Sequence, residues 1–215
     1  MCMHLTNVFR RIAAGMILGL VVLLAGSAQA SDWYVNTNAG MNGSDTYSPS
    51  GVQGTASGTP YLSIRFAIGH LTNNTYLTLT GTDIVHVAAG TYTETIIVNT
   101  NCIIRGDSGP ALTIVQANAL TNTATVATFQ LGYTNVVTLD GLTIQNGKGA
   151  LYGGGIAVSG NQGGLFGSFN ATITNCVIRN NIMANINGAG GGIALGVAGN
   201  TGNSPGSGTV PLWIP

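Results

Sequence analysis

The strongest constraint on the fold of this chain is that two short motifs recur in register along it. Ile144 and Ile178, in one motif, are 34 residues apart, and Ile156 and Ile193, in the other, are 37 residues apart. A solenoid needs such spacing, because the inward aliphatic side chain of each turn stacks on its counterpart one turn below, and Asn side chains can form ladders at the bends. An antiparallel meander has no reason to repeat in this way. The motifs are NCIIRG (101–106), GLTIQN (141–146) and NCVIRN (175–180), then GGGIAV (153–158) and GGGIAL (190–195).

Short runs of β-branched and aliphatic residues fill the chain from Asp83 onward and predict strands. Most connections between them are two to eight residues long and show no helical pattern. Parallel strands of an ordinary open sheet need crossovers of a dozen residues or more, so the repeats favour a coil whose strands stack on the next turn. The predicted strands are 84–87, 95–98, 102–104, 112–115, 125–129, 136–139, 142–144, 155–158, 172–173, 176–178 and 192–195.

Charged residues make up only 6% of the chain, against about 25% in an average soluble domain, and 33 residues are Gly. Surface helices need charged residues, so this composition disfavours helical bundles and doubly wound α/β folds. The chain from residue 31 onward carries four basic and six acidic residues, a net charge of −2. It has no basic stripe, so we expect neither nucleic-acid binding nor polybasic membrane attraction.

The first thirty residues have the pattern of a secretory signal peptide. Arg10 and Arg11 precede an apolar run over 12–26, and Ala28-Gln29-Ala30 is a small-x-small cleavage site. We therefore expect cleavage after Ala30 and a secreted or outer-surface protein, with an uncleaved anchor as the alternative. No later run reaches the roughly 20 apolar residues of a membrane-spanning helix.

The chain after the leader divides into three parts. Residues 31–82 begin with a strand at 33–35, continue as a long loop, and end in a helix over 63–71 with Ser63 as N-cap and apolar residues at i, i+3, i+4 and i+7. Residues 83–198 form the repeating coils. Residues 199–215 have a flexible, Gly- and Ser-rich composition, which we interpret as the truncated end of a longer coil protein; folding of 212–214 over the last turn is the alternative.

The segment DIVHVAAGTYTE (83–94) resembles the opening coil of right-handed parallel β-helix proteins of the pectin-lyase-like superfamily. The Gly-Gly-Gly-Ile boxes with preceding Ile-x-Asn elements resemble repeats of bacterial polymorphic outer membrane proteins. The likeness covers roughly residues 32–197. It implies an all-β, right-handed parallel β-helix whose N-terminal mouth is capped by the short helix, and a superfamily that includes polysaccharide lyases, glycoside hydrolases and adhesins.

Enzymes of that superfamily imply a small set of candidate catalytic residues. Its lyases combine acidic residues that hold calcium with an Arg or Lys base, and its hydrolases use several Asp residues in one cleft. Here Asp140, Arg105, Arg179 and Lys148 could gather on one face, because the repeat alignment puts Arg105 and Arg179 at equivalent positions. Outward, solvated charges explain them better, so we predict no catalytic residue, no cofactor and no metal, with calcium only under the lyase alternative.

The other motifs do not predict a metal, protease or phosphate-binding site. His86 alternates with Val85 and Val87 and should point outward, and no spacing of His, Cys, Asp or Glu predicts a metal site. The segment GDSGP (106–110) is similar to the nucleophile segment of trypsin-like proteases, but its residues favour a turn. Lys148 lacks the Ser or Thr of a phosphate loop.

The predicted interior consists of Ile84, Ile104, Ile144, Ile156, Ile178 and Ile193. Export favours a disulfide between Cys102 and Cys176. The repeat alignment, however, puts them two turns and roughly 10 Å apart, beyond the limit of about 7 Å for their Cα atoms, so we predict free inward thiols.

We therefore expect an exported β-helix surface module with a structural or adhesive role. Its partner would be a polysaccharide or a host-cell or other cell-surface ligand. The alternative is a polysaccharide-active enzyme, either a pectate-lyase-like lyase or a glycoside hydrolase, or a carbohydrate-binding β-helix without catalysis.

Overall fold

A computed structural model describes residues 31–40, 43–45, 54–71, 82–117, 126–131, 136–149, 153–160, 170–184 and 191–197 of the 215-residue chain. The predicted signal peptide and the 199–215 tail, with its alternative cap at 212–214, lie outside these residues. Within the described ranges, no helix is long and apolar enough to span a bilayer.

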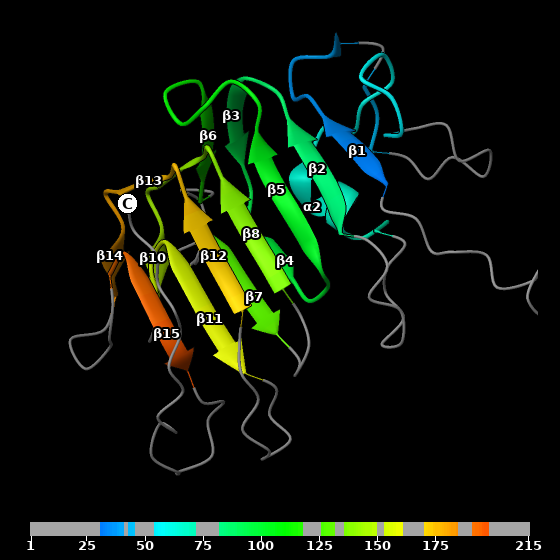
Figure 1. The fold of residues 1–215 in the computed structure, drawn as a ribbon. Coiled ribbons are helices and arrows are strands. Elements are labelled where there is room, and N and C mark those ends of the chain that lie inside the picture. The colour runs from blue at the N-terminus through cyan, green and yellow to red at the C-terminus, as the bar shows by residue number, and fades with distance from the viewer. Residues whose placement is uncertain are drawn as a thin grey trace, which may run out of the picture.

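The described chain is built almost entirely of strands, as the composition predicts (Figure 1). The elements are β1 (Asp32–Val35), α2 (Ile64–Ile68), β2 (Asp83–Val87), β3 (Gly90–Thr93), β4 (Ile96–Val98), β5 (Cys102–Gly106), β6 (Thr113–Gln116), β7 (Ala127–Leu131), β8 (Val136–Asp140), β9 (Thr143–Gln145), β10 (Lys148–Gly149), β11 (Ile156–Gly160), β12 (Asn170–Thr174), β13 (Val177–Arg179), β14 (Ile182–Met183) and β15 (Ile193–Val197). Three strands were not predicted, β3, β10 and β14, because none of them carries a run of aliphatic residues.

Every strand pairing among the described residues is parallel. Sheet A has the order β1-β2-β5-β8-β12, sheet B is β3-β6-β9-β13, sheet C is β4-β7-β11-β15, and β10 pairs with β14. In each sheet the spatial order of the strands follows their order along the chain. The all-β prediction is confirmed, and the antiparallel meander is excluded for these strands.

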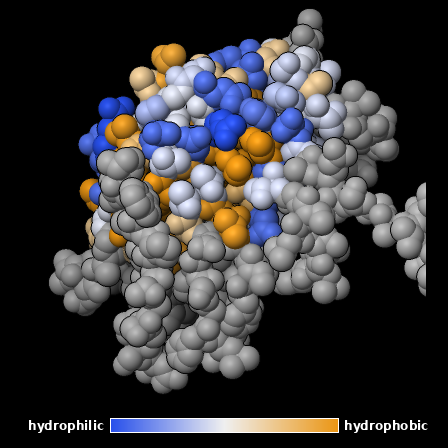
Figure 2. All heavy atoms as spheres, viewed as in Figure 1, coloured by the Kyte–Doolittle hydropathy of each residue, from blue (hydrophilic) through white to orange (hydrophobic). Residues whose placement is uncertain are grey.

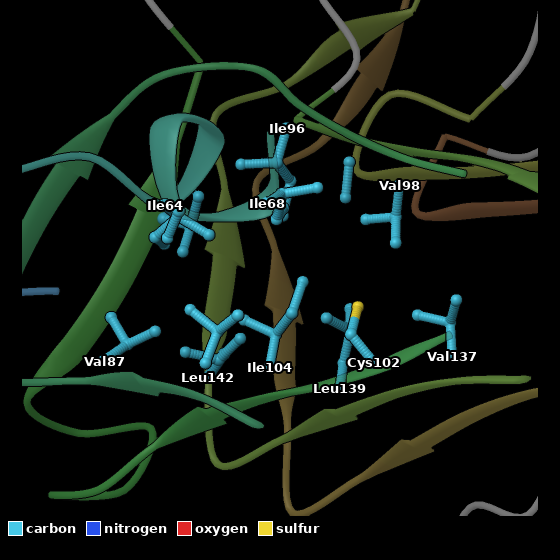
Figure 3. Close-up of a cluster of buried hydrophobic side chains, with 14 of the residues drawn as sticks. Ile64, Ile68, Val87, Ile96, Val98, Cys102, Ile104, Val137, Leu139 and Leu142 are labelled. Carbon is cyan, nitrogen blue, oxygen red and sulfur yellow. The ribbon is translucent and has the colours of Figure 1, made fainter. Parts of the chain in front are cut away.

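Like side chains stack in rows between the sheets. In sheet A the register joins Val85 to Ile104, Ile104 to Leu139 and Leu139 to Ile173. These four are buried, as are most members of the corresponding rows in sheets B and C. Figure 3 shows side chains of α2 and β4 facing those of sheet A across this interior. Burial of apolar area, at about 25 cal/mol per Å², therefore follows the stacking of one strand on the next.

The predicted interior is correct except for one residue. Ile104, Ile144 and Ile156 are fully buried, and Ile178 and Ile193, on the last strand of their sheets, are half-buried and pack against the core. Ile84 is wrong, because it lies on the half-exposed side of β2. The buried positions of β2 are Asp83, Val85 and Val87. The same alternation that points His86 outward also points Ile84 outward and Asp83 inward, so the prediction for Ile84 conflicted with it.

The repeat alignment is correct for both copies of the Gly-Gly-Gly-Ile motif and for two of the three copies of the other motif, those at 141–146 and 175–180. Ile144 pairs with Ile178 and Ile156 with Ile193, as predicted. The copy at 101–106 is misaligned, because it forms β5 in sheet A, where Cys102 lies opposite Val137. A short alternation of aliphatic residues fits the inner face of either sheet, so the motif alone cannot choose between them.

Three of the Asn residues of the motifs, all except Asn101, occupy bends with a left-handed backbone. Gly141 (φ 69°) and Asn175 (φ 52°) are equivalent positions after β8 and β12. Asn146 (φ 60°) and Asn180 (φ 55°) are equivalent after β9 and β13. Gly and Asn tolerate this region best, which explains why the repeats place them there.

Helix α2 is shorter than predicted but is capped and buried as predicted. Ser63 is the N-cap, and its Oγ accepts a hydrogen bond from Phe66 N at 3.3 Å. Ile64, Ile68 and Leu71 are buried, and the helix packs against β1, β2 and β4. It therefore covers the sheets at the end where sheet A begins with β1 (Figure 1).

Candidate functional site

Polar side chains form a row across the outer face of sheet A. The register aligns Tyr34, His86, Arg105 and Asp140 on four successive strands, β1, β2, β5 and β8. They share a face because each occupies the outward position of the strand alternation. Figure 2 shows hydrophilic residues running across the upper part of the molecule, with hydrophobic residues below them. We call the four aligned residues, Tyr34, His86, Arg105 and Asp140, the sheet A row.

His86 lies between two carboxylates at one end of the row. Its Nδ1 is 3.0 Å from Asp107 Oδ1, and its Nε2 is 3.6 Å from Asp32 Oδ1. The ring of Tyr34 stacks on the imidazole with centroids 5.0 Å apart and planes 14° apart. The His86 side chain is only 20% exposed, whereas those of Asp32 and Asp107 are 57% and 43% exposed. The prediction that His86 points outward is confirmed, and the acids that surround it stay in contact with solvent.

Arg105 and Asp140, two of the predicted candidates, form an ion pair at the other end of the row. Arg105 Nε lies 3.3 Å from Asp140 Oδ2, and Asn175 Nδ2 donates to Asp140 Oδ1 at 2.9 Å. Both oxygens of this carboxylate therefore already accept a hydrogen bond. A carboxylate held in this way is suited to orienting a ligand or its neighbours more than to proton transfer.

The other two candidates lie elsewhere, which corrects the prediction that Arg105 and Arg179 are equivalent. Arg179 is on sheet B, where its Nε donates to Gln145 Oε1 at 3.0 Å. Lys148 is exposed on β10. The four residues therefore do not gather on one face, because the misaligned motif copy put Arg105 in the wrong sheet.

Arg179 ends a hydrogen-bonded ladder on the outer face of sheet B. Gln145 Nε2 donates to Gln116 Oε1 at 3.1 Å, and Gln116 Nε2 donates to Thr93 Oγ1 at 3.1 Å. The sequence suggested amide ladders of Asn at the bends, whereas this ladder runs mainly through Thr, Gln and Arg beside the bend. Asn146, at the bend itself, joins it by donating to Gln116 Oε1 at 3.3 Å. It ties four successive strands together along their surface.

The described ionisable groups with perturbed pKa values are not members of the sheet A row. Burial raises the pKa of Glu94, although the N–H groups of Ile64 and Arg65 that donate to its carboxylate oppose this. Burial raises the pKa of Tyr92 to about 12, and its hydroxyl donates to Ala88 O at 2.9 Å. Burial, helped by the charge of Asp83, raises the pKa of Cys102 to about 12. These groups hold the fold together.

The structure adds Asp32, Tyr34, Asp107 and Asn175 to the residues singled out from the sequence. The alternation of β1 could have indicated the outward direction of Asp32 and Tyr34. These two residues meet His86 through the pairing of β1 with β2, about fifty residues further along the chain, and Asp107 and Asn175 reach the row because they follow β5 and β12. The sequence gives no local signal for these pairings. The row offers an aromatic ring, hydrogen-bond donors and hydrogen-bond acceptors on one accessible face.

Within the described ranges, no group of three or more His, Cys, Asp or Glu side chains could hold a metal ion. Compared with protein-family models, curated proteins and solved structures, the chain has no match.

Proposed function

We propose that this chain is an exported right-handed parallel β-helix, secreted or displayed on the outer surface of a bacterium, with a structural or adhesive role. The observation that carries the proposal is the strand order. Sheets A, B and C each take strands in chain order, and every pairing is parallel, as expected if the chain winds around a common interior. Stacked aliphatic rows supply the cohesion of such a coil.

The outer faces support an adhesive role. They combine hydroxyl and amide groups with the charged side chains of the sheet A row and with exposed aliphatic residues such as Val136. A ligand would meet their hydrogen-bond partners at the strand spacing of about 4.8 Å. The sheet A row adds the ring of Tyr34 and the Arg105–Asp140 pair to this array. Aromatic rings combined with hydrogen-bonding groups are suited to polyhydroxylated ligands such as cell-surface polysaccharides.

Adhesion is tested by measuring how the exported full chain binds to immobilised polysaccharides and to host-cell surfaces. We expect the double variant Tyr34→Ala, Arg105→Ala to lose most of the binding. Lys148→Ala, a change of an exposed cation away from sheet A, is the matched control and should bind as the wild type does. Equal binding by all three proteins would rule out the sheet A row as the adhesive surface.

A polysaccharide-active enzyme is the second candidate, favoured by the carboxylates, His86 and Arg105 that share the outer face of sheet A. It is tested by incubating the chain with a panel of polysaccharides, with and without calcium. Unsaturated uronides would indicate a lyase, and new reducing ends without them would indicate a hydrolase. Binding without either product would leave a carbohydrate-binding module.

A further inference from the structure

The first residue expected after leader cleavage contacts a buried carboxylate. Ser31 N lies 2.8 Å from Asp83 Oδ1, and Asp83 is fully buried at the first position of β2. The carbonyl of Ser31 accepts a hydrogen bond from Ile84 N at 3.0 Å, so Ser31 is held on both sides next to β2. The nitrogen that cleavage after Ala30 would release therefore already lies within bonding distance of a carboxylate.

We propose that leader cleavage converts this contact into a partly buried ion pair between the Ser31 α-ammonium group and the Asp83 carboxylate. Hydrolysis of the Ala30–Ser31 bond adds the hydroxide of water to the carbonyl carbon of Ala30 and a proton to Ser31 N. The released amine then takes a second proton from solvent. The inference rests on the proposed export, because only a processed chain has an amine at Ser31.

The chemical reason is the difference between the two forms of the same nitrogen. In the precursor Ser31 N is an amide, which gives Asp83 one neutral hydrogen bond. After cleavage it carries a full positive charge at the same place, and charge-assisted hydrogen bonds are roughly twice as strong as neutral ones. A carboxylate removed from water gains most from such a partner.

The position of the pair links processing to the folding of the N-terminal edge. Asp83 begins β2, and Asp32, the residue after Ser31, begins β1, the strand that pairs with β2 at the edge of sheet A. The ion pair therefore fixes the start of β1 against β2. Export and maturation would stabilise the edge that α2 also covers.

The test uses the full chain exported with its own leader, carrying Lys148→Arg. Lys148 is the only lysine of the chain, so in this variant amine reagents modify the α-amino group alone. N-terminal sequencing establishes whether the chain begins at Ser31. Tm is then measured for the unmodified protein, for an α-N-acetylated sample that has lost the charge, and for a reductively dimethylated sample that keeps it.

We expect acetylation to lower Tm by at least about 3 °C and dimethylation to lower it much less. In Asp83→Asn acetylation should have little effect, whereas in Asp107→Asn, the control at an exposed acid, it should act as in the wild type. Equal effects of acetylation and dimethylation, or no effect of acetylation, would overturn the ion pair, and this comparison holds even if Asp83→Asn does not fold.

A failure of export is distinguishable from a failure of the pair. If sequencing shows an uncleaved leader or another first residue, the proposed processing is wrong at that position. The pair is then tested on the same chain cut before Ser31 at an inserted protease site, where the three Tm values decide it alone.

Discussion

At the scale of single residues, the bends show that different residue types can adopt the same left-handed backbone conformation, and that the physical reason for the residue differs between bends. Gly141 and Asn175 occupy equivalent left-handed positions, although Asn175 carries a side chain and Gly141 does not. A Cβ at Gly141 would lie 2.8 Å from Gly106 O, so this bend also requires the absence of a side chain. A Cβ at Gly109, where φ is 75°, would have no atom of a non-neighbouring residue within 4 Å.

Alanine at these two glycines should therefore have unequal costs. Gly109→Ala should cost about 1 kcal/mol, because only the left-handed backbone opposes it. Gly141→Ala should cost at least about 2 kcal/mol more, because Gly106 O must also move. Urea unfolding of the two variants measures the difference, and equal losses would contradict the close approach.

The two thiols should differ in reactivity. The two cysteines of the described ranges are free; Cys102 is fully buried with a pKa raised to about 12, whereas Cys176 is half-buried. Thiolate is the reactive form, so at pH 8 iodoacetamide should label Cys176 slowly and leave Cys102 unlabelled in the native protein. Peptide mass spectrometry checks this, with guanidinium-unfolded protein as the control in which both react. Equal native labelling would show that Cys102 is accessible.

At the scale of elements, α2 shows how a five-residue helix is held by residues from other parts of the chain. Glu94, after β3, accepts hydrogen bonds from Ile64 N at 2.9 Å and Arg65 N at 2.8 Å. Asp45 accepts from Leu62 N and Ser63 N. Such a short helix is unstable alone, so these caps and the burial of its apolar side determine whether it forms.

Replacing Glu94 should destabilise this element in a pH-dependent way. Glu94→Ala leaves two helix N–H groups without their acceptor and should cost about 1–2 kcal/mol. Because burial raises the pKa of Glu94 in the folded state, its contribution to stability is fully present below the unfolded pKa and falls as pH rises through the folded value. Glu94→Gln, which cannot ionise, should lack this fall.

Urea unfolding of the wild type and Glu94→Gln at several pH values from 4 to 7 provides the measurement. Ser63→Ala serves as a matched control, since it removes one cap without removing a titrating group. The same pH dependence in Glu94→Gln as in the wild type would assign that dependence to another residue.

At the scale of the whole molecule, each strand is bonded only to the strands next to it in its own sheet. Sheet A shows the consequence most clearly, because β5 has β2 on one side and β8 on the other, whereas β12 pairs only with β8 among the described strands. Stability in such an arrangement is approximately a sum over neighbouring layers. Strands that pair with one neighbouring strand should therefore open before strands that pair with two.

Hydrogen exchange should follow this order. Amides of β5 and β8 should exchange most slowly, and those of β12 and β13 at least tenfold faster, because each layer is held by its neighbours. Exchange followed by mass spectrometry gives the rates by segment. Uniform protection across the four strands would mean that the molecule opens as one cooperative unit.

The sequence by itself determined most of the strands, most of the inward side chains and the helix. Alternation in β5 and the 3.6-residue spacing in α2 are local properties, so they can be read without knowing which segments meet. The same holds for the Ile144–Ile178 and Ile156–Ile193 repeats, whose spacing reflects stacking. The direction of His86 also followed from alternation alone.

Only the tertiary structure decided which strands meet and what lies beside them. It assigned residues 101–106 to sheet A, separated Arg105 from Arg179, joined Arg105 to Asp140, and placed Asp83 inside against Ser31. An alternating strand fits any sheet with one buried face, so its sheet is set by the length and path of the intervening chain. A buried carboxylate depends on a partner distant in sequence, and no local pattern encodes that partner.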